Sequence, residues 1–252
     1  MITLYDIPGK LPGQAWSPNT LKSRLALNFK GLPFHTEWVE YPEIEGLYKT
    51  LDLAPTNVQP DGVTPYYTLP IIVDASIPGK DPVVVSDSWN IAVYLDQAYP
   101  DAPLLFPKGT KALQAAFQET WMDAFFWPAT VFLRPRTPEI ALNPRSAEHF
   151  RRTRSHQLGR PLAEIEPKGE ARVAYLKEWE EKLGKVARVY EGVTDERYLT
   201  GDEAVYADLL AGAYVRYFRV IGGKEEWEIV SGWHGGLLKR IGEASEKYAM
   251  LP

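Results

Sequence analysis

The chain has 252 residues, of which 45% are hydrophobic, and has a formal net charge of −5 and no cysteine. The negative charge gives no general attraction to nucleic acid, and the missing cysteine excludes disulfides, thiolate metal sites and a cysteine nucleophile. Any thiol chemistry must therefore use a thiol that a ligand brings. No segment approaches the ~20 apolar residues that cross a bilayer, and the strand-like first residues do not form a secretory signal, so we expect a cytoplasmic protein without a membrane partner.

The first hundred residues combine strand and helix patterns. Apolar runs predict four strands, over Ile2 to Tyr5, Phe34 to Val39, Thr68 to Val73 and Val83 to Val85. After the first strand and after the fourth, apolar residues recur at the three- and four-residue intervals of a helix. The stretch from Glu40 to Pro65 holds four prolines and is longer than an ordinary connection, which is typical of a functional lid or wall. We therefore predict a mixed α/β domain with such a wall.

A break follows near residue 100. Three prolines and a glycine between Tyr99 and Gly109 cannot continue a helix. Beyond the break the periodic segments are all helical, over Ala112 to Phe126, Ala147 to Leu158, Ala171 to Glu191, Tyr206 to Ile221, and Glu225 to Tyr248 with an interruption around Gly235-Gly236. We therefore predict an α/β domain over residues 1–98, a linker over 99–110 and an all-helical domain over 111–252.

The most informative motif is Trp16-Ser17-Pro18-Asn19, between the first strand and the first helix. Ser17 can cap that helix while Pro18 occupies its first turn, where the missing backbone N–H is harmless. A hydroxyl at the positive end of a helix dipole favours anions and could stabilise a thiolate that a substrate brings. A serine in this position is more often only a cap, so the motif needs support from elsewhere in the chain.

Two later segments give that support. Leu69-Pro70 lies near the start of a strand, where proline survives only at an edge, a bulge or a cis bend. Asp87-Ser88 stands where the fourth strand turns into a helix, so a carboxylate and a hydroxyl lie beside another helix N-terminus. Both residues could simply cap that helix, but an exposed carboxylate can also pair with a peptide's free ammonium group.

The order of these three motifs resembles the amino-terminal half of a cytosolic glutathione transferase of the serine type. That family has a thioredoxin-like domain with a Ser-Pro helix start, a cis-proline strand and an acidic-Ser helix start, followed by an all-helical domain. Tyr198 to Asp202 and Ala207 to Leu210 are similar to the buried helix start of the second domain. One departure is Val205, where the family has Ser or Thr as part of a capping box, so only Asp208 can act as a cap here.

The resemblance implies roles for several residues. Ser17 would donate to the thiol sulfur of glutathione, and Asp87 and Ser88 would hold its γ-glutamyl end. The backbone of Leu69, before a cis Pro70, would pair with the cysteinyl backbone. The remaining assignments are weaker, because Thr68 is either a glycyl contact or a strand-surface residue, and Asn19 either assists Ser17 or bonds its own helix start. Glutathione as co-substrate, no metal and a homodimer are further implications.

Aromatic residues gather near the end of the first helix of the second domain. Trp121 and Phe125 have core-like spacing, but with Trp127 and Trp16 they could also line a pocket for flat apolar electrophiles. We place this pocket beside the glutathione site, with Pro128 ending the helix near Trp127. The basic run from Arg145 to Arg160 is interpreted as a solvated helix face, and the histidines form no metal or triad pattern.

These inferences lead to a glutathione transferase that attacks apolar, aromatic electrophiles. The Ser-Pro-Asn-Thr sequence and the long Glu40 to Pro65 stretch look most like the fungal etherase-like class related to bacterial β-aryl etherases, so aryl ethers are candidate substrates. Two other functions remain open, a non-catalytic glutathione-dependent carrier (ligandin) for aromatic or polyphenolic compounds and a scaffold. A cysteine-type thiol reductase is disfavoured because Ser17 cannot form a mixed disulfide.

Overall fold

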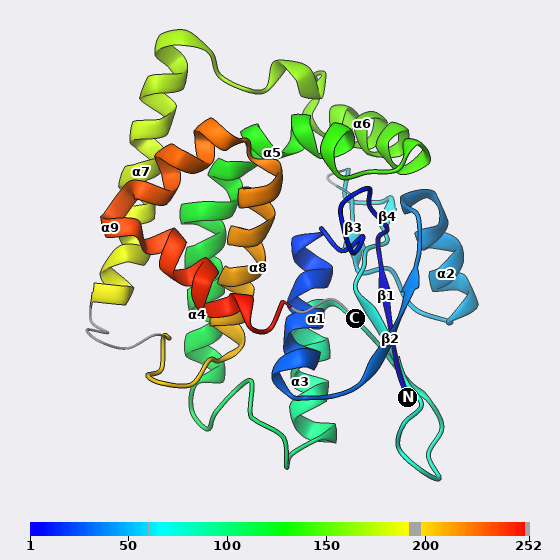
Figure 1. The fold of residues 1–252 in the computed structure, drawn as a ribbon. Coiled ribbons are helices and arrows are strands. Elements are labelled where there is room, and N and C mark those ends of the chain that lie inside the picture. The colour runs from blue at the N-terminus through cyan, green and yellow to red at the C-terminus, as the bar shows by residue number, and fades with distance from the viewer. Residues whose placement is uncertain (60, 192–197, 250–252) are drawn as a thin grey trace.

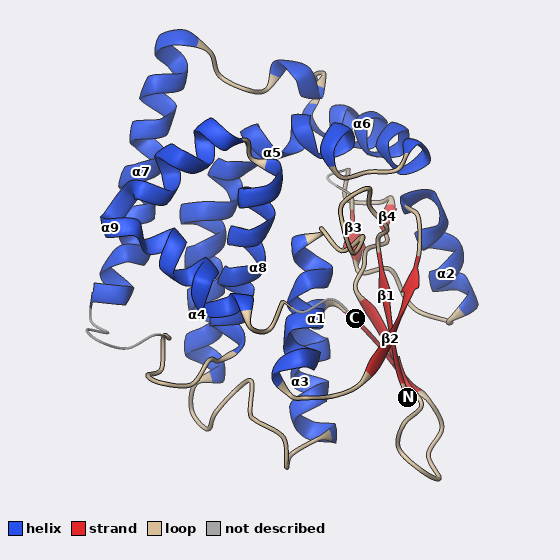
Figure 2. Cartoon of the chain, in the orientation of Figure 1, coloured by secondary structure: helices blue, strands red, loops and turns tan. Residues whose placement is uncertain are grey.

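The computed structural model describes residues 1–59, 61–191 and 198–249, so Pro60 and residues 192–197 and 250–252 of the predicted helical domain lie outside the described residues. Figures 1 and 2 show a small sheet on one side of the molecule and a group of helices on the other. The predicted fold class, a thioredoxin-like domain followed by an all-helical domain, is confirmed. Helices α1 and α3 lie between the sheet and the helical group, and α2 lies on the far side (Figure 1).

The first domain is built on a four-stranded sheet in the order β2-β1-β5-β6. Strands β1 and β2 run parallel, whereas β5 is antiparallel to both β1 and β6. Alternate residues of β1 are buried, as expected for a strand with one face in a core. The elements are β1 (Ile2–Asp6), α1 (Pro18–Phe29), β2 (Phe34–Trp38), β5 (Ile71–Asp74), β6 (Val83–Ser86) and α3 (Ser88–Ala98).

The stretch from Glu40 to Pro65 is more ordered than the loop that we expected. It contains a 3-10 turn, α2 and a small hairpin, over Tyr41–Glu43, Ile44–Thr50, Asn57–Val58 (β3) and Pro65–Tyr66 (β4). Its prolines do not prevent this, because Pro42 lies in the first turn of a helix and Pro65 begins a strand. The buried Tyr48 fixes the stretch to the segment before β5, since its hydroxyl donates to the carbonyl of Thr68 at 2.7 Å.

The helical domain surrounds one almost entirely buried helix, α8. It packs against α1 of the first domain and against α4, α5 and α9 of its own domain. The non-helical backbone from Trp233 to Gly236 confirms the predicted interruption in α9. Within the described residues, no helix is long and apolar enough to cross a membrane. The helices are α4 (Lys111–Trp121), α5 (Trp127–Ile140), α6 (Pro144–Leu158), α7 (Gly169–Glu191), α8 (Tyr206–Ile221) and α9 (Lys224–Glu246), with a 3-10 turn at Leu162–Glu164.

The prediction that Pro128 ends a helix is wrong. A π-helical turn over Met122–Phe126 joins α4 to α5, and the helical path continues to Ile140. Proline lacks an N–H and its ring crowds the carbonyl four residues earlier, and a wider π turn just before it avoids both conflicts. Trp127 therefore lies within a continuous helical path and not at a helix terminus.

Asp208 accepts hydrogen bonds at the start of α8, as expected when Val205 cannot act as a side-chain cap. Its carboxylate accepts hydrogen bonds from the backbone N–H groups of Val205 and Leu199, both at 3.0 Å. Valine has no side-chain acceptor, so the reciprocal half of a capping box is missing. Burial raises the pKa of Asp208 to about 6. Two further N–H groups at the start of α8 have other acceptors, since Tyr206 donates to the Leu105 carbonyl at 3.0 Å and Ala207 to Oε1 of Gln114 at 2.9 Å.

Candidate functional site

Four of the predicted site residues line one cavity of about 250 Å³ between the two domains. Ser17 and Asn19 border it from the start of α1, and Thr68 and Leu69 border it from the segment before β5. The 40–66 stretch forms another wall, with residues that include Tyr41, Ile44, Glu45 and Tyr66. A substrate in this cavity would contact the start of α1 and the segment before β5 at the same time.

Ser17 occupies the N-cap position of α1, but its hydroxyl makes no capping hydrogen bond. The helix start uses the Ser17 carbonyl, which accepts from the Leu21 N–H at 2.9 Å. Pro18 supplies no N–H to the first turn. Although the Ser17 residue is only 3% exposed, it borders the cavity. Its hydroxyl is therefore available to a group bound at the positive end of the helix.

The backbone before β5 faces the same cavity. The Leu69-Pro70 peptide bond is cis, as predicted. Among the residues that the structure describes, the N–H and C=O of Leu69 have no hydrogen-bond partner. Buried backbone groups are almost always paired, so an unpaired N–H and C=O beside a cavity indicate a site for a peptide-like ligand. The Thr68 hydroxyl, by contrast, donates to Thr56 Oγ1 at 3.0 Å.

Asp87 and Ser88 lie at the N-terminus of α3, next to the cavity rather than in its lining. Oδ1 of Asp87 caps the helix by accepting from the N–H groups of Trp89 at 2.9 Å and Asn90 at 3.1 Å. The Asp87 N–H donates to the carbonyl of Pro70 at 3.3 Å, which joins this helix start to the cis-proline segment. Asp87 thus acts as a cap while its Oδ2 has no protein donor in the described part of the chain.

A buried lysine lies near Asp87. Lys22 is 7% exposed, and its Nζ lies 5.3 Å from the ring centroid of Tyr214. Burial lowers the pKa of Lys22 to about 8, and the charge of Asp87 opposes this shift. The Tyr214 hydroxyl donates to Oδ1 of Asn19 at 3.3 Å, so α8 holds the side chain of a predicted site residue.

The interpretation of the basic run as a solvated face is wrong for Arg154. Arg154 and His149 project from α6 into the cavity lining, where His149 stacks on Tyr41 with a centroid distance of 6.0 Å. Burial and neighbouring arginines lower the pKa of His149. A signal was present in the sequence, because Ala147, Phe150 and Arg154 are spaced three and four residues apart on one helix face, and the first two are buried.

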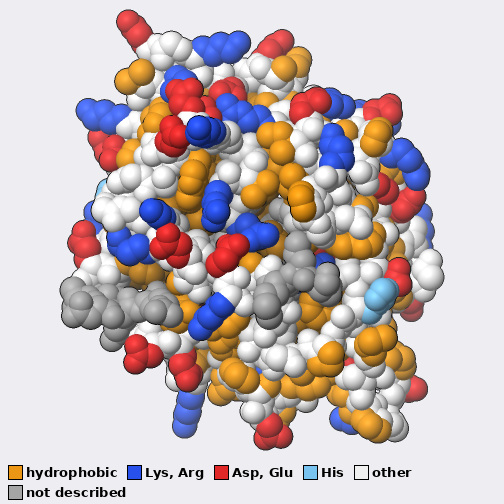
Figure 3. All heavy atoms as spheres, viewed as in Figure 1, with side chains coloured by type: hydrophobic (Ala, Val, Ile, Leu, Met, Phe, Trp, Pro, Cys, Tyr) orange, Lys and Arg blue, Asp and Glu red, His pale blue; other side chains and the backbone are white. Residues whose placement is uncertain are grey.

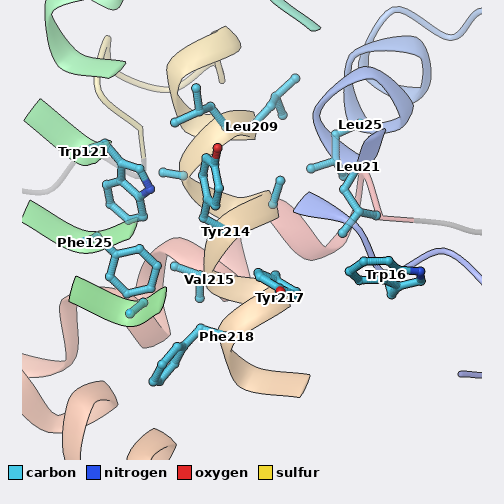
Figure 4. Close-up of a cluster of buried hydrophobic side chains, with 14 of the residues drawn as sticks. Trp16, Leu21, Leu25, Trp121, Phe125, Leu209, Tyr214, Val215, Tyr217 and Phe218 are labelled. Atoms are coloured by element: carbon cyan, nitrogen blue, oxygen red, sulfur yellow. The ribbon is translucent and has the colours of Figure 1, made fainter. Parts of the chain in front are cut away.

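The predicted aromatic pocket is also wrong in part. Trp121 and Phe125 have no exposed surface and pack in the helical core beside Phe218, on the opposite side of α8 from Trp16 (Figure 4). Side chains with no exposed surface cannot form the wall of an open pocket. Trp127 is 52% exposed and contacts the ring of Phe126.

Trp16 borders a second cavity, of about 210 Å³. Tyr217 lies across from it, with the two ring centroids 6.0 Å apart. Leu11, Pro12, Ala15, Leu21, Arg216 and Val220 complete the lining. This cavity does not share a lining residue with the one at Ser17. The predicted aromatic site residues therefore divide among a core, an exposed position and a separate cavity.

Among the described residues, the charged side chains on one face of the molecule form no large patch of a single sign (Figure 3). On the face that Figure 3 shows, basic and acidic side chains are interspersed. Within the described ranges, no group of three or more histidine, cysteine, aspartate or glutamate side chains could hold a metal ion. The lining of the Ser17 cavity itself supplies hydroxyl, imidazole, guanidinium and carboxylate side chains.

Comparison with known proteins matches both domains. Residues 16–98 match the family model for the N-terminal domain of glutathione S-transferase, and residues 112–248 match the model for the C-terminal domain. A curated relative, the glutathione S-transferase-like protein ustS of Aspergillus flavus, is 31% identical over an alignment that covers 98% of this chain and 94% of that protein. The chain therefore belongs to the glutathione S-transferase family.

Solved structures of fungal enzymes are similar over the full length. A glutathione S-transferase of Ceriporiopsis subvermispora, CsGST63524, in complex with glutathione, is 39% identical with a TM-score of 0.89, covering 100% of this chain and 98% of that chain. Glutathione transferase GSTFuA3 of Phanerochaete chrysosporium is 36% identical with a TM-score of 0.90 and the same coverage. These similarities are consistent with the fungal etherase-like class that the sequence resembles.

Proposed function

We propose that the protein binds glutathione in the Ser17 cavity and conjugates it to apolar, aromatic electrophiles. The observation that supports this best is the unpaired backbone of Leu69 beside the unbonded hydroxyl of Ser17. A cysteinyl residue that pairs with Leu69 as an added strand would place its thiol near the start of α1. The CsGST63524 structure in complex with glutathione supports the choice of this tripeptide.

The two ends of glutathione would bind in different places. Oδ2 of Asp87 would take the γ-glutamyl ammonium group, and the N-terminus of α3 with Ser88 would take the adjacent carboxylate. The hydrogen bond from the Asp87 N–H to the Pro70 carbonyl holds this subsite next to the cysteinyl subsite. The glycyl end would then extend past Thr68 into the cavity, with Asn19 near the thiol.

Ser17 would act by stabilising the thiolate. An ordinary cysteine thiol has a pKa near ~8.5, and each unit by which the pKa falls corresponds to about 1.4 kcal/mol of preferential thiolate stabilisation. The Ser17 hydroxyl donates to the sulfur and stays protonated, while the thiol proton leaves to solvent. The sulfur lone pair then forms the C–S bond, and the leaving group, a halide or an aryloxide, departs with its bonding electrons.

The Ser17→Ala variant tests this mechanism. We expect the apparent pKa of bound glutathione, measured from thiolate absorbance against pH, to rise, and the conjugation rate with an aryl chloride to fall roughly ten- to hundredfold. Calorimetry should give nearly unchanged glutathione affinity. Ser23→Ala removes another buried hydroxyl of α1 and is the matched control. Unchanged thiol pKa and rate in Ser17→Ala would show that Ser17 only occupies the helix cap.

Cleavage of aryl ethers is part of the same proposal, since an aryloxide is a possible leaving group. Parallel assays on an aryl chloride and on a β-aryl ether distinguish a transferase from an etherase. We also propose a cytoplasmic homodimer, as the family resemblance implies. Sedimentation should give twice the chain mass, and a monomeric mass would contradict this assignment.

A second candidate function is the non-catalytic carriage of aromatic or polyphenolic compounds. The cavity between Trp16 and Tyr217 supports it, because two aromatic side chains and several aliphatic ones suit a flat apolar ligand. Since this cavity is separate from the Ser17 cavity, both functions are compatible in one chain.

A further inference from the structure

The cavity at Ser17 has a cationic side chain that the proposed chemistry does not use. Arg154 is half-buried on α6, and its Nη2 donates to the hydroxyl of Tyr66 at 2.8 Å. Its Nη1 donates to Oε1 of Gln157 at 3.3 Å. The guanidinium also lies 5.1 Å from the ring centroid of Phe150. These contacts hold the charged group against the β3–β4 hairpin of the other domain.

All of these partners are neutral. Other arginines of the same helix have carboxylate partners, since Arg145 pairs with Glu43 and Arg151 with Glu139. Arg154 forms no ion pair with any carboxylate in the described residues. The cavity does contain the carboxylate of Glu45, but Lys49 pairs with it at 2.7 Å.

Nearby groups add to this positive field. Burial together with the charge of Arg154 lowers the pKa of Arg134, and burial with Arg152 and Arg154 lowers the pKa of His149. Positive charges that lie close together in a partly desolvated cavity repel one another, and a bound anion relieves this repulsion. The observations therefore indicate an anion site at the α6 end of the cavity.

The orientation of the ligand identifies that anion. If the γ-glutamyl end lies at Asp87, outside the cavity lining, a tripeptide that pairs with Leu69 would extend past Thr68 into the cavity, which Tyr66 and Arg154 also line. Tyr66 is the residue that holds Arg154. We propose that Arg154 binds the glycyl carboxylate of glutathione, so that α6 of the helical domain completes the glutathione site. This inference rests on the proposed function and adds a specificity residue to it.

Calorimetry with glutathione and its glycyl monoethyl ester tests the pairing, since the ester replaces the negative charge in question by an ethyl ester, and Arg154→Gln separates the effect of the charge from that of the added ethyl group. The unaltered protein should bind the ester roughly tenfold more weakly than glutathione, because a charge-assisted pair is lost. Arg154→Gln should weaken glutathione binding by a similar factor and should bind both ligands nearly equally. Arg154→Lys keeps the charge and should retain part of the preference.

Two controls separate charge from structure. Arg160→Gln removes an exposed charge just beyond the end of α6 and should keep the full preference for glutathione. Tyr66→Phe removes the hydroxyl that holds Arg154 but keeps its charge, and should keep most of the preference.

The outcomes distinguish this inference from the proposed function. Equal binding of glutathione and ester by the unaltered protein, or an unchanged preference in Arg154→Gln, would overturn the role of Arg154 and leave glutathione binding in place. Absence of any glutathione binding by the unaltered protein would overturn the proposed function itself. The ester comparison needs no variant, so equal binding of the two ligands would overturn the role of Arg154 even if Arg154→Gln fails to fold.

Discussion

Asp6 and Arg24 form an ion pair of 2.9 Å between β1 and α1, and neither side chain is more than 1% exposed. Asp6 also accepts from the Ile7 N–H at 2.7 Å, and Arg24 donates to Thr36 Oγ1 at 3.0 Å. The pair links the first helix to both parallel strands of the sheet. It therefore helps to position the start of α1, where Ser17 borders the cavity.

Removing one member of this pair should be strongly destabilising. Asp6→Asn leaves the Arg24 charge buried without a counter-ion, a change that typically costs about 3–5 kcal/mol. We expect a loss of that size in the free energy of unfolding, measured by urea denaturation. Asp101→Asn, at an exposed position in the linker, is the control.

A double variant shows whether the pair itself stabilises the fold. Asp6→Leu with Arg24→Met removes both charges and should cost less than Asp6→Asn alone, because no buried charge is left without a partner. A double variant that is less stable than the single one would show that the ion pair is a net source of stability.

Lys22 should destabilise the fold at neutral pH. Its ammonium group is buried, and its pKa of about 8 lies below the ordinary 10.5. Below pH 8 the Lys22 side chain is protonated in both the folded and the unfolded chain. The buried ammonium group then lowers the free energy of unfolding by about 3 kcal/mol for a pKa shift of this size. Between pH 8 and 10.5 the folded chain releases the proton first, so stability relative to a neutral side chain rises with pH.

Lys22→Met removes this cost. We expect its unfolding free energy to exceed that of the unaltered protein at pH 7, and the difference to shrink as the pH rises from 8 toward 10.5. Denaturant titrations at several pH values measure it, with the exposed Lys239→Met as the control. A difference that does not change with pH would mean that the Lys22 ammonium is solvated.

Much of the first domain could be predicted because its signals are local. Strand alternation, the Ser17-Pro18 helix start and the proline at position 70 depend on neighbouring residues, and the structure confirms four strands and the cis bond, although the third strand begins at Ile71 after the cis bend and not at Thr68. The breaks near residue 100 and at Gly235 are local for the same reason. By contrast, the sequence predicts a helix end at Pro128 because proline usually breaks a helix, and the π turn that accommodates it is not visible in the sequence pattern.

The walls of the site were harder to predict because they depend on contacts between domains. Arg154 is on a helix rich in charge, and only the docking of α6 on the β3–β4 hairpin shows that it faces a cavity. Trp121 and Phe125 had the spacing of core residues, and the structure buries them completely. Amphipathic spacing shows that a face is covered, but not whether protein or a ligand covers it.

Asp87→Asn separates the two roles of the Asp87 carboxylate. The amide oxygen of asparagine can accept from Trp89 and Asn90 as Oδ1 does now, so stability should change by less than about 0.5 kcal/mol. Loss of the negative charge should weaken glutathione binding roughly tenfold, as measured by calorimetry. Asp87→Ala should lose the same affinity and a further ~1 kcal/mol of stability, because the cap is lost as well.

The effect should be confined to binding in the asparagine variant. Adding Ser88→Ala to Asp87→Asn should weaken binding further, since a second γ-glutamyl contact is removed. If a folded Asp87→Asn protein binds glutathione as well as the unaltered protein, the carboxylate is only a helix cap.

The cavity beside Trp16 should bind flat aromatic compounds, and Trp16 makes this binding measurable. A polyphenol that lies between Trp16 and Tyr217 should quench tryptophan fluorescence. Trp127→Phe removes an exposed tryptophan that could be quenched by collision, so the titration is done in this background. Val220→Phe, at the border of the cavity, should fill part of its volume of about 210 Å³ and weaken quenching at least several-fold.

Glutathione, which would occupy the other cavity, should leave the quenching curve unchanged. Quenching that is equally strong in the Val220→Phe protein would place the aromatic ligand elsewhere, and competition by glutathione would place it in the Ser17 cavity.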